Sequence, residues 1–100
     1  AAHREFAQQV FRQHDFRAGA RFEDFYLVQC VWEDVMAESV ARELGAGRMV
    51  VLAGNGHIQF AYGIPARAFS RNGAPFRTVF LASPGEEPAA GIAYYVWTVE

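Results

Sequence analysis

The stretch that decides the fold is residues 49–67, MVVLAGNGHIQFAYGIPAR. It opens with a continuous apolar run at residues 49–53, the pattern of a strand buried on both faces. The run ends in Gly-Asn-Gly-His at residues 54–57, and Pro65 then stands where a short helix over residues 66–71 is expected to begin. Open α/β sheets bind ligands just beyond the carboxyl ends of their parallel strands. The stretch therefore predicts a strand-to-helix connection at a ligand-binding position, with a histidine in it.

Two further strands are expected, at residues 77–82 (RTVFLA) and 92–99 (IAYYVWTV). About twenty residues separate the first two of the three strands, which is room for a right-handed helical crossover, so these two are predicted to be parallel. The third strand follows the loop SPGEEPAAG, and its orientation stays open. The predicted fold class is α/β, with a small three-stranded, mostly parallel sheet and a βαβ crossover. Because so narrow a sheet is so apolar, it is expected to belong to a larger α/β domain or to meet a partner chain.

A pair of helices is predicted ahead of the sheet. Residues 3–14 place apolar side chains at i, i+4 spacings, with arginine and glutamine between them. Residues 23–44 have apolar side chains at three- and four-residue steps and end before two glycines that suit a helix C-terminus. We therefore expect a helical part, residues 1–44, followed by an α/β part, residues 45–100, forming a single domain or the C-terminal portion of a larger one.

The composition is that of one small globular domain. A net charge of −2 and the absence of lysine leave no basic surface for nucleic acid. The chain is 15% aromatic, and such side chains line ligand pockets or subunit interfaces, although a phenylalanine-rich core explains them equally well. The single Cys30 cannot form an internal disulfide, and no apolar run in this chain suits a signal peptide or a transmembrane helix.

His57 is the first candidate site residue. Gly54 and Gly56 before it permit positive φ and the close approach of a backbone or a ligand. The motif is not a dinucleotide fingerprint, because Gln59 stands at the third glycine position, and no Lys-Ser/Thr pair follows to make a phosphate loop. The alternative is a tight turn whose histidine only caps the next segment.

Tyr62 and Arg67 follow in the same stretch. A tyrosine phenolate can ligate ferric iron, and an arginine can pair with a carboxylate or a propionate. The alternatives are an ordinary core or rim tyrosine and a solvated arginine. His3 and His14 are three helical turns apart, about eleven residues, and would share one face of a continuous helix. They could bind a metal, although a histidine on a surface helix is usually only solvated.

Other chemistry has no motif in its support. HExxH, CxxC and GxSxG are all absent, so neither a closed zinc site nor a serine nucleophile is indicated. Glu33 and Asp34 are interpreted as a solvated helix face, because adjacent helical residues point about 100° apart. Trp32 and Met36 are interpreted as core residues, and Cys30 as a small hydrophobe.

Three blocks of the chain resemble one known family, the ChaN-like haem-binding uptake proteins of the Tiki/TraB superfamily. Residues 25–41, FYLVQCVWEDVMAESVA, are similar to a Phe-x-x-Ala-Gln-x-x-Trp-Asp-x-x-Met-Ala helix, with valine in place of the alanine. Residues 50–67 are similar to a Gly-x-Gly-His … Gly-Ile-Pro-x-Arg segment, which is the most specific of the three. Residues 93–98, AYYVWT, are similar to a terminal Ala-Asp-Tyr-x-Trp strand, with Tyr94 where aspartate is common.

The resemblance implies a bacterial iron-uptake lipoprotein that binds haem as a homodimer in the cell envelope, in the periplasm or at the outer membrane, held to the membrane only through a lipid anchor upstream of this chain. It implies iron held through a tyrosine, with histidine at the metal or the propionates. Tyr62 and His57 are the candidate metal ligands, and Tyr26 stays open as the alternative tyrosine. The cofactor-binding set that the resemblance implies is His57, Tyr62, Tyr26, Gly54, Gly56, Arg67 and His14.

No catalytic residue is assigned. Full-length members of the family are much longer, and their first half, with an acidic/His motif, has no counterpart in these residues. The alternative function is a metal-dependent hydrolase of the wider superfamily, which would be incomplete in this chain.

Overall fold

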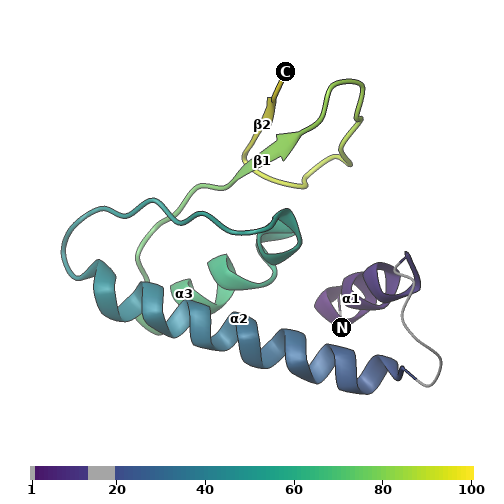
Figure 1. Cartoon of the computed structure of the whole chain (residues 1–100). Coiled ribbons are helices and arrows are strands. Elements are labelled where there is room, and N and C mark those ends of the chain that lie inside the picture. The colour runs from purple at the N-terminus through teal and green to yellow at the C-terminus, as the bar shows by residue number, and fades with distance from the viewer. Residues whose placement is uncertain (1, 14–19) are drawn as a thin grey trace.

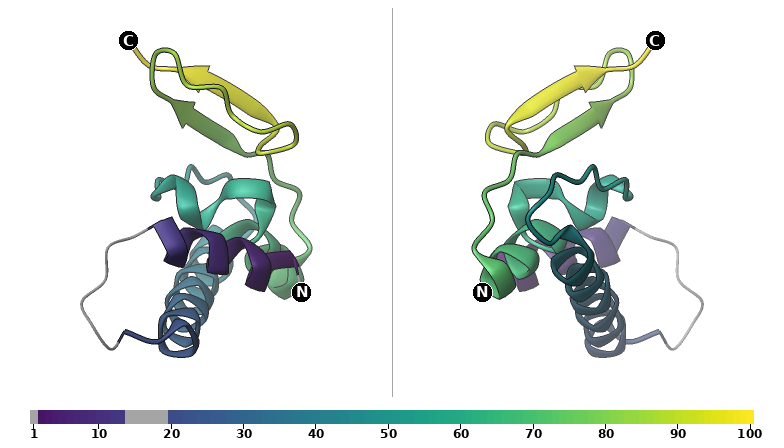
Figure 2. Two further views of the ribbon diagram at one scale, coloured as in Figure 1. Left: turned by 90° about the vertical axis from the view of Figure 1, so that its right-hand side faces the viewer. Right: turned by 90° about the vertical axis from the view of Figure 1, so that its left-hand side faces the viewer.

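The computed structural model describes residues 2–13 and 20–100. The elements in chain order are helix α1 (Ala2–Gln13), helix α2 (Phe22–Leu44), the short 3₁₀ turns η1 (Asn55–His57) and η2 (Gln59–Ala61), helix α3 (Ile64–Asn72), and strands β1 (Val79–Ala82) and β2 (Tyr95–Thr98). The long helix α2 lies along one side of the molecule, and the strands lie at the opposite end (Figure 1). The two 3₁₀ turns lie in the layer between strands and helices (Figure 2).

The helices follow the local signals of the sequence. Helices α1 and α2 lie within one residue of the predicted bounds over the described residues. Acidic Glu23 and Asp24 occupy the first turn of α2, where they favour the helix dipole, and Gly45 ends the helix with a φ of +55°. Helix α3 is longer than predicted and ends at Gly73, which has a φ of +66° and donates its N–H to the Phe69 carbonyl at 2.7 Å.

The sides of α2 are arranged differently from the prediction. Trp32, interpreted as a core residue, is 62% exposed, so that interpretation is wrong. The inward side of α2 instead carries Glu33 and Ala37, which are one helical turn apart and both buried. A 3.6-residue period of apolar side chains identifies an amphipathic helix. Because α2 is apolar on more than one side, only tertiary packing decides which of these sides is buried.

Strands β1 and β2 form a two-stranded parallel sheet, with Val79 opposite Tyr95 and Ala82 opposite Thr98. Because side chains alternate along a strand, Phe80 and Ala82 point into the molecule and form a small core with Ile92. Phe60 of η2 packs against this core, and its N–H donates to the Ile92 carbonyl at 2.7 Å. The second 3₁₀ turn is thereby attached to the underside of the sheet.

The predicted first strand, residues 49–53, does not form. Val50 and Leu52 are 87% and 89% exposed, so the expectation of a strand buried on both faces is wrong, as are the three-stranded sheet and the βαβ crossover. A strand exists only where a neighbouring edge offers matching N–H and C=O groups, which an apolar run cannot reveal. Here the side-chain amide of Asn55 donates to the Leu81 carbonyl of β1 at 3.0 Å, and this bond holds the 54–57 loop beside the carboxyl end of that strand.

Candidate functional site

Glu33 lies at the centre of the candidate site. Its side chain is 1% exposed, and each carboxylate oxygen faces an imidazole from a different element. His57 of η1 places Nδ1 3.4 Å from Oε1, and His3 of α1 places Nε2 3.1 Å from Oε2. A buried carboxylate is stable only when hydrogen-bond donors or positive charges surround it. The two imidazoles take the place of the water molecules that burial removes.

The His3 contact is an ion-pair distance without an aligned hydrogen bond. Among the described residues Oε2 has no hydrogen-bond partner, although His3 Nε2 lies only 3.1 Å away. The separation suits a hydrogen bond, but the ring is not oriented at the angle that a hydrogen bond requires.

Arg67 completes this group from α3. Its Nε lies 3.8 Å from Glu33 Oε2, and its Nη1 lies 3.7 Å from Asp34 Oδ1. Arg71 Nη2 lies closer to the same Asp34 oxygen, at 2.8 Å. The four residues His3, Glu33, His57 and Arg67 are called the Glu33 cluster below. The adjacent acids of α2, interpreted as a solvated face, thus take separate roles: Glu33 is buried in the cluster and Asp34 joins α2 to α3.

Gly63 makes room for the cluster. A Cβ at this position would lie 2.6 Å from the His57 carbonyl oxygen and 2.8 Å from the Glu33 carboxyl carbon. Both separations are far below contact distance, so no other residue fits here without movement. The glycine is required by the close approach of Glu33 and not by its φ of −59°.

Two tyrosines share the surroundings of His3. Its ring centroid lies 5.6 Å from that of Tyr26 and 5.9 Å from that of Tyr62. Tyr62 in turn packs in tilted arrangements against Phe6 and Phe60, with ring centroids 5.7 and 5.6 Å away. Burial raises the pKa of the Tyr26 phenol, and a hydrogen bond with Cys30 raises it further.

The two glycines of the 54–57 loop do not use left-handed backbone or closely approach another part of the chain. Gly54 has a φ of −59°, and a Cβ on Gly56 would meet nothing within 4 Å. Left-handed backbone occurs instead at Phe60 and Ala61, with φ of +55° and +59°. His14, also in the predicted set, lies outside the described residues.

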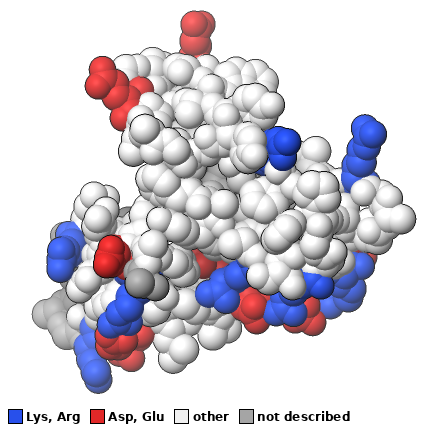
Figure 3. Space-filling view, turned by 180° about the vertical axis from the view of Figure 1, so that it is seen from behind, with Lys and Arg blue, Asp and Glu red and all other residues white. Residues whose placement is uncertain are grey.

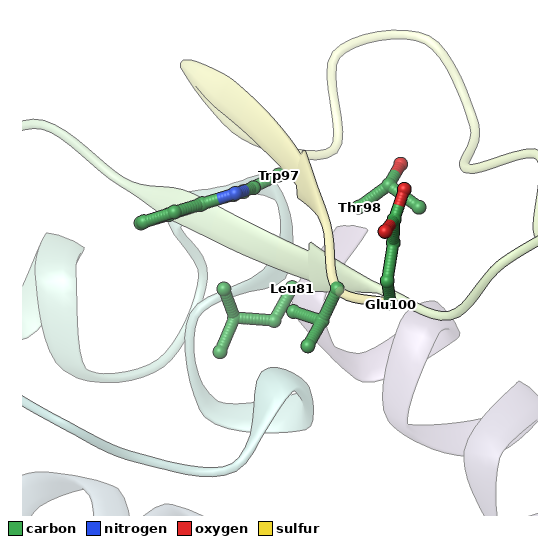
Figure 4. Close-up of a pocket in the computed structure, with 5 residues that line it drawn as sticks. Leu81, Trp97, Thr98 and Glu100 are labelled. Atoms are coloured by element: carbon green, nitrogen blue, oxygen red, sulfur yellow. The ribbon is translucent and has the colours of Figure 1, made fainter.

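A hollow of about 450 Å³ lies between α1 and the 3₁₀ turns, and its size suits a small ligand. It is lined by Phe6, Gln9, Val10, Gln13, Gly56 and Gln59. A second hollow, of about 610 Å³, lies at the end of the sheet beside Leu81, Trp97 and Thr98 (Figure 4). No member of the Glu33 cluster lines either hollow. Figure 3 shows basic and acidic side chains alternating along the lower edge of the molecule, with a largely uncharged surface above them.

Glu33 is the residue that sequence reasoning missed. Its signal was the spacing to Ala37, because a helical turn separates the two positions and the small alanine marks the packed side of α2. A second signal was the family pattern, in which an acid follows the tryptophan at the position of Glu33. Within the described part of the chain, no three His, Cys, Asp or Glu side chains are arranged to hold a metal ion. The helices described are also too short or too polar to cross a bilayer.

The part of the chain that contains the Glu33 cluster matches a known protein family. A family model described as haem-binding uptake, Tiki superfamily, ChaN, matches residues 1–68. The chain therefore belongs to the ChaN haem-binding uptake family of the Tiki superfamily. The matched region contains the whole Glu33 cluster and both tyrosines, and strands β1 and β2 lie beyond it. No curated protein and no solved structure matches this chain.

Proposed function

We propose that this chain binds haem at the Glu33 cluster, as the haem-binding module of a bacterial iron-uptake lipoprotein. The observation that carries the proposal is His57, whose Nδ1 faces a buried carboxylate at 3.4 Å inside the region that matches the family. An imidazole held at one nitrogen by a carboxylate is the usual arrangement of a histidine that ligates through the other. The donor set therefore fits the group that the family binds.

Each residue has a role in the proposal. His57, 26% exposed, offers Nε2 toward a ligand, and Tyr62 offers a phenol among aromatic rings. Haem iron, when bound, accepts an imidazole nitrogen or a phenolate oxygen as axial ligand. Arg67 holds its two carboxylate contacts at 3.7 and 3.8 Å, long enough to exchange them for a propionate. Between the two tyrosines, Tyr62 is favoured as the ligand because it lies in the same stretch of chain as His57 and Arg67.

The proposal extends to assembly and location. Exposed apolar side chains on α2 support a dimer, since exposed apolar patches mark contact surfaces. These are Leu27, Val28, Val31, Trp32 and Val35. Family membership supports a place in the cell envelope, with a lipid anchor upstream of these residues and the chain forming part of a larger α/β domain. Labelling of the full-length protein with a radioactive fatty acid tests the anchor, and absence of label would contradict it.

Hemin titration tests the haem site. Addition of hemin to the purified protein is expected to give a saturable shift of the Soret band. His57→Ala and Tyr62→Phe are each expected to weaken the apparent affinity about tenfold or more, as loss of a ligand does at metal sites. Tyr95→Phe is the matched control, because Tyr95 lies exposed on β2, outside the matched region, and should leave the titration unchanged.

The result that would overturn the proposal is the absence of a saturable shift at micromolar hemin, or equal shifts in wild type and His57→Ala. Metal analysis of the same sample tests the alternative of a metal-dependent hydrolase. Bound divalent metal near one equivalent, without any Soret change, would favour that alternative.

A further inference from the structure

We propose that Glu33 is the positioning residue of this site and that it fixes opposite ring tautomers in two histidines, His57 and His3. The consequence for haem affinity rests on the function proposed above, whereas the tautomers are a property of the protein alone. His3 thereby joins the site, although it lies on α1, far from the 54–57 motif in sequence.

The first step is the burial of the carboxylate. The Glu33 side chain is 1% exposed, and Oε1 and Oε2 face different rings, at 3.4 Å from His57 and 3.1 Å from His3. An ionised carboxylate accepts hydrogen bonds and donates none. We therefore expect a ring nitrogen that faces it to carry a proton, because otherwise two acceptors would meet at a buried carboxylate. At His3 the 3.1 Å separation favours this arrangement, although the ring is not aligned for a hydrogen bond.

The second step follows from which nitrogen of each ring faces Glu33. His57 faces it with Nδ1, so a neutral His57 carries its proton there and leaves Nε2 as the acceptor. His3 faces it with Nε2, so a neutral His3 is the opposite tautomer and leaves Nδ1 as the acceptor. One carboxylate thus prepares two unprotonated nitrogens for a ligand.

The third step is the support of the carboxylate itself. Gly63 leaves the space that Glu33 fills, since a Cβ there would lie 2.9 Å from Oε1. Arg67 adds positive charge 3.8 Å from Oε2. With α2 behind it and these two groups beside it, the carboxylate has little room to turn, and the orientation of both rings follows from its own.

The experiment measures the tautomers by ¹⁵N NMR of the imidazole side chains at neutral to mildly alkaline pH, without haem. In the wild type we expect the Nδ1–H form of His57 and the Nε2–H form of His3. In Glu33→Gln the amide has one acceptor oxygen and one donor NH₂, so it cannot accept from both rings. The ring that faces the NH₂ group should then present an unprotonated nitrogen to it, so at least one histidine should lose its wild-type tautomer.

Asp34→Asn is the matched control, because Asp34 contacts Arg67 and Arg71 but neither imidazole among the described contacts. It should leave both tautomers as in the wild type. The proposal falls if wild-type His57 is the Nε2–H tautomer, if Glu33→Gln leaves both rings unchanged, or if Asp34→Asn changes them equally. Should Glu33→Gln not fold, the wild-type tautomers decide alone.

Hemin titrations separate this inference from the proposed function. We expect Glu33→Gln to weaken hemin binding about tenfold, the usual effect of removing a carboxylate behind a ligating histidine. Glu38→Gln, exposed on α2, should leave hemin binding unchanged. A wild type with the stated tautomers and no hemin binding would overturn the function but not the positioning. Hemin binding and tautomers that both ignore Glu33→Gln would overturn the positioning but not the function.

Discussion

Two single residues, Gly63 and Glu33, define the centre of the candidate site. The space that Gly63 leaves is occupied by the carboxylate of Glu33, and the Cβ of any other residue would lie 2.8 Å from the carboxyl carbon. Glu33 in turn is 1% exposed and depends on His3, His57 and Arg67 for its partners. Gly63 and Glu33 are thus one structural unit, and we expect a change in either residue to alter the positions of both imidazoles.

Gly63→Ala tests this unit. The added methyl group must displace the Glu33 carboxylate or the His57 backbone, which we expect to lower the free energy of unfolding by about 1–3 kcal/mol. Urea denaturation measures the change. Gly56→Ala is the control, because a Cβ there meets nothing within 4 Å, and its effect should stay within about 0.5 kcal/mol. Equal effects of the two substitutions would contradict the close packing at Gly63.

Among the elements, the 3₁₀ turns connect the site to the sheet. The side chain of Asn55 in η1 bonds to β1, and the backbone of Phe60 in η2 bonds to the Ile92 carbonyl. At the second attachment the chain bends sharply, and Phe60 and Ala61 have positive φ. Left-handed backbone costs a non-glycine residue about 1–2 kcal/mol, so this segment is strained where it directs Tyr62 toward the aromatic rings.

Ala61→Gly tests the strain. Glycine adopts a φ of +59° without penalty, and after allowance for its greater freedom when unfolded we expect a gain of about 0.5–1 kcal/mol in unfolding free energy. The matched control is Ala66→Gly in α3, where the helical backbone should make the same change destabilising by about 1 kcal/mol. Thermal unfolding followed by circular dichroism gives both signs, and a destabilised Ala61→Gly would contradict the strain.

For the molecule as a whole, much apolar surface is exposed at both ends. Parallel sheets are normally covered on both faces, yet Val79, Leu81 and Trp97 are exposed on one face of the β1–β2 sheet. Helix α2 carries its own exposed apolar side, with Val31 and Trp32 on it. Both surfaces suit contact with other polypeptide, and the dimer proposed above uses the α2 side.

Trp32→Glu tests that contact. A carboxylate in place of a 62% exposed tryptophan would be desolvated in the dimer, so we expect the dimer dissociation constant to rise about tenfold or more. Sedimentation equilibrium measures it, with Glu38→Gln, also exposed on α2, as the control that keeps the wild-type value. A monomeric wild type would contradict the dimer, and a dimer lost with Trp97→Glu instead would move the contact to the sheet.

Local chemistry in the sequence determined the helices and the residue types of the site. Capping glycines and acidic first turns are short-range signals, so α1, α2 and the start of α3 could be predicted with small errors at their ends. The motif around His57, together with Tyr62 and Arg67, was identified from pattern and resemblance. These signals act within a few residues, which is why a single sequence carries them.

The tertiary structure alone decided pairing and burial. Whether residues 49–53 become a strand depends on a neighbouring edge, and the pairing of β1 with β2 joins segments that share no local signal. Whether Glu33 is solvated or buried depends on which side of α2 meets the 3₁₀ turns and α1. The sequence by itself determined which residues could do the chemistry. The folded chain decided that a buried acid stands between two histidines, because burial and long-range contact are properties of the packed molecule and not of any stretch within it.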